Sequence, residues 1–286
     1  MLFNCRLRDV GDIAPWHSVL GGRARPTLDW PGLSEGWYWL DVGGHELFRY
    51  GAASLQREVP WRASSAVLPY AVGTIALHWG DWLEQLPPML APLPSALAER
   101  VADADAWRAW QERAARWQQR QDGAAARATY QWACGWWGDY RLTSDYLTAD
   151  SPCRSLQLWC WRDQDRVHLR WDNRELLLRG QPIWAAEVGE YALPTHTFLD
   201  EIRAFNTRFV AAMGERVAAV NAHWPRPEVA LDRDRLVRHQ REQAAWFTGR
   251  IARIGQTVAD DAAAVLTDDW RAILAAIARI ERDSTP

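Results

Sequence analysis

His45 and Glu46 are the residues of the chain that come closest to a catalytic motif, because they open the pattern His-Glu-x-x-His of helix-borne zinc sites. Position 49 is Arg, so the second histidine ligand is missing. The flanking residues are typical of a strand, which cannot place two ligands one helical turn apart on the same face. We therefore expect no zinc site here, and retain Asp41, His45, Glu46 and Arg49 as candidates for binding a ligand or partner.

Two further groups of polar residues are candidates for binding. His168 and Arg170 lie on a predicted strand and would converge with the first group if both predicted hairpins belonged to one sheet. Asp232, Asp234 and Glu242 lie in the helical C-terminal part, where acids would attract a basic partner and speed its encounter. The alternative for these three acids is that they only solvate a helix end.

The absence of lysine excludes several mechanisms. All 33 basic residues are Arg, whereas a P-loop, a protein kinase and Schiff-base chemistry each need a lysine side chain. A GC-rich coding bias explains this usage; the alternative is a surface selected for Arg, which binds carboxylates and stacks on aromatic rings. The sequence also lacks the nucleophile elbow, the dinucleotide fingerprint and the calcium loop.

The four Cys residues show neither a Cys-x-x-Cys pair nor zinc-type spacing, so we expect free thiols. From this and the missing motifs we expect no catalytic residue, no cofactor and no metal.

Tryptophan is abundant, with 20 residues. Trp107, Trp110 and Trp117 fall on one face of a predicted helix, so we expect them in the core. Twenty Trp exceed what one core commonly uses. We therefore expect a few of them at an exposed site or a partner interface.

Length and composition predict a globular protein of one large domain or two small ones. The chain has 286 residues, 48% of them hydrophobic and 24% charged. The net charge of -3 argues against a general nucleic-acid binder. No run approaches the roughly 20 apolar residues of a membrane span, and the first residues lack the apolar core of a signal peptide. We expect a cytoplasmic protein that binds neither nucleic acid nor membrane.

The pattern of apolar residues predicts an α+β fold, in which antiparallel β-hairpins or sheets pack against several long helices and the C-terminal third is helical. The expected parts of the single domain, 1–286, are a β-rich part (1–65), a helical part (70–145), a β-hairpin (155–172) and a second helical part (195–283).

Particular residues fix the expected ends and faces of the helices. Phe205 and Phe209 lie on the apolar stripe of the longest helix and are predicted to be buried. The proline pair Pro87-Pro88 is expected to end one helix, and Gly255 another.

The strongest local signal lies in residues 36–50, where aromatic and β-branched residues flank the pair Gly43-Gly44. Glycine supplies the positive φ of a tight turn, so this segment predicts a β-hairpin. Trp37 and Tyr38 point to opposite faces of the hairpin, and we expect one face to be buried and the other displayed.

The same segment, Gly-Trp-Tyr-Trp-Leu-Asp-Val-Gly-Gly-His-Glu-Leu-Phe-Arg-Tyr, resembles the hallmark of an uncharacterised bacterial family, a domain of unknown function common in GC-rich genomes. The resemblance continues through residues 68–70, the helix to Leu90, the strand pair at 156–171 and the helix from Phe198, and so covers most of the chain. It brings no catalytic residues with it. By analogy, families of this kind are often encoded beside secreted bacterial toxins and serve as immunity proteins.

Two functions of different classes follow. The first is a cytoplasmic binding protein that neutralises a partner, a secreted bacterial toxin, by direct association; Trp and Arg are enriched at the hot spots of such interfaces. The second is an enzyme or small-ligand binder with a Trp-lined pocket for a nucleotide or a sugar. A deep pocket joining residues of both hairpins would favour the second, and a shallow acidic or aromatic face the first. We favour the binding protein.

Overall fold

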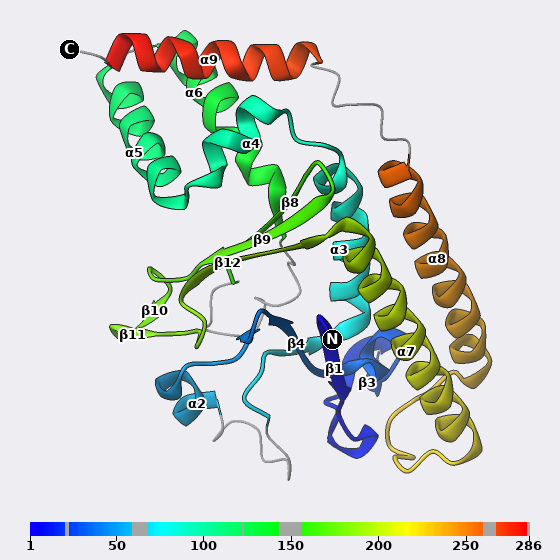
Figure 1. The fold of residues 1–286 in the computed structure, drawn as a ribbon. Coiled ribbons are helices and arrows are strands. Elements are labelled where there is room, and N and C mark those ends of the chain that lie inside the picture. Colours follow the sequence, from blue (N-terminus) through cyan, green and yellow to red (C-terminus); the bar gives the residue numbers. More distant parts are fainter. Residues whose placement is uncertain (21–22, 59–67, 122, 143–155, 260–266, 285–286) are drawn as a thin grey trace.

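The computed structural model describes residues 1–20, 23–58, 68–121, 123–142, 156–259 and 267–284. These residues form an α+β fold with antiparallel sheets and long helices, and the C-terminal part is helical, as the sequence predicts (Figure 1).

The N-terminal sheet is built around the strand that carries the hairpin signal. Strand β4 (Glu35–Val42) pairs with β1 (Phe3–Leu7) on one side and with β5 (His45–Leu47) and β6 (Val72–Thr74) on the other, all antiparallel. A separate hairpin joins β2 (Trp16–Leu20) to β3 (Arg23–Thr27).

A second antiparallel sheet has the order β12-β9-β8-β7. Its strands are β12 (Val188–Pro194), β9 (Arg166–Asp172), β8 (Leu158–Asp163) and β7 (Arg141–Leu142). Strands β8 and β9 form the hairpin predicted within residues 155–172 and lie at the centre of the sheet, and residue 155 lies outside the described residues. The short strands β10 (Leu177–Leu178) and β11 (Gln181–Pro182) pair beside this sheet.

The helices gather at two places (Figure 1). Beside the N-terminal sheet lie α1 (Trp30–Leu33), α3 (Ile75–Leu90), α7 (Thr195–Ala222) and α8 (Arg233–Ala259), and α8 packs on both α3 and α7. Beyond the second sheet lie α4 (Ser95–Ala102), α5 (Ala104–Arg120), α6 (Ala124–Cys134), the 3-10 helix η3 (Gly135–Tyr140) and α9 (Asp268–Ser284). A short helix, α2 (Ala52–Glu58), follows the hairpin.

Two expected helix ends are wrong. Helix α3 passes through Pro87 and Pro88 to Leu90, because the side chains of Met89 and Leu90 are buried in the core and their packing offsets the lost backbone bonds. Helix α8 continues past Gly255 to Ala259, since Val258 still packs against the core.

The buried residues confirm the predicted apolar faces of two helices. Phe205 and Phe209 are buried, and so are Trp107, Trp110 and Trp117. The hairpin buries the face of Tyr38 and displays the opposite face only near the turn, where Asp41 is exposed. Tyr38 packs against the ring of His78 in α3 at 4.5 Å, and the Arg8 guanidinium lies 5.9 Å from the centre of the Trp37 ring on the other face.

The turn of the hairpin depends on two glycines with positive φ, +58° at Gly43 and +86° at Gly44. We predict that Gly43→Ala and Gly44→Ala each lower the free energy of unfolding by about 1–2 kcal/mol, because an L side chain is strained there. The loss should be larger at Gly43, whose added Cβ would lie 2.8 Å from the Tyr191 ring.

Chemical denaturation measures both losses. Gly138→Ala is the control, since Gly138 has no positive φ and an added Cβ would contact nothing within 4 Å. Wild-type stability in both turn variants would contradict the assigned turn.

Candidate functional site

The hairpin places three of the predicted residues along the edge of a surface hollow. Strand register pairs Val42 with His45 and Asp41 with Glu46. After β5 the chain is fixed by two isolated bridges, Arg49 to Tyr70 and Tyr50 to Trp184.

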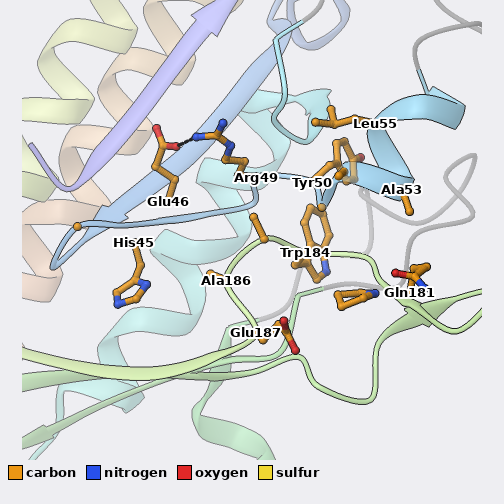
Figure 2. Close-up of a pocket in the computed structure, with 15 residues that line it drawn as sticks. His45, Glu46, Arg49, Tyr50, Ala53, Leu55, Gln181, Trp184, Ala186 and Glu187 are labelled. Carbon is orange, nitrogen blue, oxygen red and sulfur yellow. Dashed lines mark hydrogen bonds and ion pairs between the residues drawn. The ribbon is translucent and has the colours of Figure 1, made fainter.

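The hollow has a volume of about 640 Å³ and is open to solvent. Figure 2 shows that His45, Glu46 and Arg49 line one side, and that Gln181, Trp184 and Glu187 come from the segment before β12. The rings of Tyr50 and Trp184 are stacked, with centroids 4.9 Å apart and planes 10° from parallel. Trp184 is 3% exposed, so the stack forms a rigid base for the hollow.

Glu46 is the centre of the charge network here. Its carboxylate accepts hydrogen bonds from the Arg49 guanidinium and, at 2.5 Å, from the hydroxyl of Tyr70. The bond from Tyr70 lowers the pKa of Glu46, and Arg49 adds to the effect. Burial and the bond to Glu46 raise the pKa of Tyr70 to about 12. Glu46 therefore stays ionised and Tyr70 stays a neutral donor over the physiological range.

His168 and Arg170 meet on a carboxylate that sequence reasoning missed. Glu190 lies opposite Arg170 in the register of β9 and β12. It accepts from Arg170 Nε at 2.8 Å and lies 3.2 Å from His168 Nδ1. Burial raises the pKa of Glu190, but the hydrogen bonds from His168 and Arg170 outweigh it, so its pKa lies below the ordinary value.

Trp161 covers this second group. The His168 ring stacks on Trp161 at 4.8 Å, and the Arg170 guanidinium lies 5.0 Å from the centre of the same ring. Arg170 also donates to the backbone carbonyl of Ala102 at 3.0 Å, which ties the sheet to the end of α4.

The two groups do not form one site. Their hairpins belong to different sheets, so the condition for convergence is not met, and neither His168 nor Arg170 lines the hollow. The sheets instead contact near the turn of the first hairpin, where the His45 ring lies 5.3 Å from that of Trp171. Asp41 is exposed and lies outside the hollow.

The three acids of α8 are separate from both groups. Asp232 caps the helix, because its carboxylate accepts from the backbone N–H of Arg235 at 2.9 Å. Asp234 and Glu242 are exposed. Arginines alternate with these acids along the first turns of α8, at positions 233, 235, 238 and 241, so this surface carries both signs of charge.

Tyr70, Trp184 and Glu190 are the site residues that the sequence analysis did not assign. For Glu190 a signal was present, since Val188, Tyr191 and Leu193 give the segment strand-like composition. For Tyr70 no local signal existed, because its partner Glu46 is 24 residues away.

The possible metal ligands and thiols of the described residues do not come together as a metal site. No group of three His, Cys, Asp or Glu side chains among the described residues is placed to hold an ion. Cys5, Cys134 and Cys160 are free thiols, and burial raises the pKa of each, to about 11 for Cys5 and about 12 for Cys134. Cys153 lies outside the described residues.

The fold and the site thus define an α+β protein with an aromatic, charge-paired surface hollow. Residues 2–276 match a family of unknown function, DUF5984, and the chain belongs to this family. The resemblance to an uncharacterised domain family is confirmed over nearly the whole chain. No curated protein and no solved structure matches it. Within the described ranges, no helix has the length and apolar character needed to cross a membrane.

Proposed function

We propose that this protein acts by binding another protein, and that the partner it neutralises is a secreted bacterial toxin. The proposal rests on the pairing and ionisation of the carboxylates at the candidate residues. Glu46 is held by Arg49 and Tyr70, and Glu190 by Arg170, and both have a lowered pKa. A general acid or base works best with a pKa near the pH of the reaction. Fixed ionised pairs are better suited to recognition.

The composition of the hollow also supports recognition of a protein. The Arg49 side chain is 47% exposed at the rim of the hollow, and Arg is one of the residue types enriched at interface hot spots. The paired Glu46 holds the guanidinium in place before a partner arrives, which reduces the entropy lost on binding.

A small-ligand binder is the second candidate. The volume of the hollow, about 640 Å³, lies in the range of about 300–1,000 Å³ that is usual for ligand sites, and a Trp lines it. A nucleotide or a sugar would then lie against the polar rim of the hollow, because the Tyr50–Trp184 stack beneath it is buried.

Co-expression with the product of the neighbouring gene tests the proposal. We expect the protein to restore growth to cells that produce this product, and the two to co-purify as a complex. Arg49→Ala should weaken the purified complex by about tenfold or more, as expected for a hot-spot arginine.

Arg203→Ala is the matched control, because Arg203 is similarly exposed and forms the same kind of ion pair three residues apart, with Asp200. Equal affinities of both variants would place the interface elsewhere. If the neighbouring product is not toxic and the purified protein retains a small molecule, the ligand-binding function replaces the one proposed.

A further inference from the structure

A groove between α6, η3 and α9 differs from the hairpin hollow in both shape and charge. Its volume is about 790 Å³, and we call it the aromatic groove. Its walls are made by aromatic rings, two prolines and two carboxylates: Pro88, Pro92, Trp132, Trp136, Asp139, Tyr140, Asp269 and Trp270. Helices α6 and α9 lie side by side at the end of the molecule that is far from α2 (Figure 1).

Three of the rings pack edge to face in the wall of the groove. Trp136 stands nearly perpendicular to Trp270, at 86° with centroids 6.1 Å apart, and to Tyr140, at 81° and 5.9 Å. The indole N–H of Trp136 donates to the Ala133 carbonyl at 3.1 Å, so its polar edge is satisfied. Trp132 adds a further ring and is 46% exposed. Because Trp136 and Tyr140 are buried, the ring surface that is open to a ligand belongs mainly to Trp132 and to the half-buried Trp270.

The charges of the aromatic groove have one sign. Asp139 and Asp269 are exposed, and neither has an ion-pair partner among the residues that the structure describes. No Arg or His belongs to the lining. The neighbouring Asp268 differs, since it pairs with Arg271 at 2.7 Å.

We propose that the aromatic groove binds an organic cation, an alkyl ammonium or guanidinium group. The faces of aromatic rings are negative and attract such cations, with an affinity that grows as the cation is desolvated against the ring. The two unpaired carboxylates add a negative field without competing arginines. An apolar stem on the cation would cover the prolines and Ile273.

Two kinds of molecule carry such a cationic group: a free small cation, and a polypeptide with a basic side chain. The site is distinct from the hairpin hollow, and the inference does not depend on the proposed toxin partner.

Titration with defined probes tests this site. The free cations are tetramethylammonium and N-butylguanidinium, and the peptide is acetyl-Leu-Arg-Leu-amide. Their neutral counterparts are tert-butanol, N-butylurea and the same peptide with citrulline in place of Arg. We expect saturable calorimetric binding of the cations at about millimolar dissociation constants or tighter, and at least about fivefold weaker binding of the neutral counterparts. The kind of ligand with the lower dissociation constant, free cation or peptide, identifies the source of the cationic group.

Matched variants locate the binding. Trp132→Ala should weaken it by about five- to tenfold and remove one shifted indole N–H signal from the NMR spectrum, whereas Trp16→Ala, another exposed Trp at 42%, should leave it unchanged. Asp269→Asn should weaken it by about threefold or more at low salt. Asp268→Asn changes the same helix turn outside the groove and should have no effect.

The proposal would be overturned by equal binding of cations and neutral counterparts, or by no saturable binding of any cation. It would also be overturned if Trp16→Ala weakened binding as much as Trp132→Ala. Failure to find a toxin partner would leave all of these measurements intact.

Discussion

Replacing Phe205 by Ala should lower the free energy of unfolding by about 3–5 kcal/mol, the usual cost of deleting a buried phenyl ring. Phe205 is 5% exposed and packs against Trp79 at 4.6 Å and Phe209 at 6.0 Å between ring centroids. It also contacts Phe3 of β1, at 5.9 Å, and so joins the longest helix to the N-terminal sheet. Neighbours fixed in three different elements, α3, α7 and β1, cannot collapse fully into the cavity.

Urea denaturation followed by circular dichroism measures the loss. Thr207→Ala is the control, because Thr207 is exposed on the same helix, and its variant should stay within about 0.5 kcal/mol of the wild type. A loss below about 1 kcal/mol in Phe205→Ala would show that this side chain is not part of a packed core.

Acid should destabilise the protein through His78. This side chain is 4% exposed, and neither ring nitrogen has a hydrogen-bond partner in the described part of the chain. Burial lowers its pKa from 6.5 to about 3. Between these two values the unfolded chain binds a proton that the folded chain does not, so stability falls as the pH falls, by about 1.4 kcal/mol per pH unit.

The free energy of unfolding should therefore be unaffected by the titration of His78 above pH 6.5. At pH 4.5 it should be lower by about 2.7 kcal/mol because of this residue. Urea denaturation at pH 7, 5.5 and 4.5 gives the slope of the free energy of unfolding against pH. The effect of His78 is the difference in this slope between the wild type and His78→Gln, whose side chain cannot titrate. His223→Gln, at an exposed histidine, is the control and should keep the wild-type slope. If His78→Gln kept that slope as well, His78 would not be the group responsible.

The hairpin shows how far local sequence reasoning reaches. The Gly43-Gly44 pair predicts the turn because the preference for positive φ acts within one residue, and the strands on either side follow from period-two alternation. The prediction that one face of the hairpin is displayed holds only near the turn, where Asp41 is exposed, because Trp37 on the same face is covered by Arg8, which follows β1.

Helix ends show the same limit. Pro87-Pro88 and Gly255 are strong local signals for termination, yet the helices continue for two and four residues beyond them. Burial of side chains such as Met89 in the core outweighs a local preference of a few kcal/mol. Asp232, in contrast, caps α8 as a local signal should, because its oxygen reaches a backbone N–H of the first turn without help from any other element.

The sequence by itself determined the α+β class, the hairpins, the helical C-terminal part and the burial of Phe205, Phe209 and the helical tryptophans, because periodicity and turn chemistry are properties of neighbouring residues. It also marked His45, Glu46 and Arg49 as neighbours on one segment. Only the tertiary structure decided that Tyr70 joins Glu46, that His168 and Arg170 meet on Glu190, and that Trp136, Tyr140 and Trp270 form one groove. These contacts depend on strand register and helix packing, which join residues far apart in the chain, and no local preference specifies them.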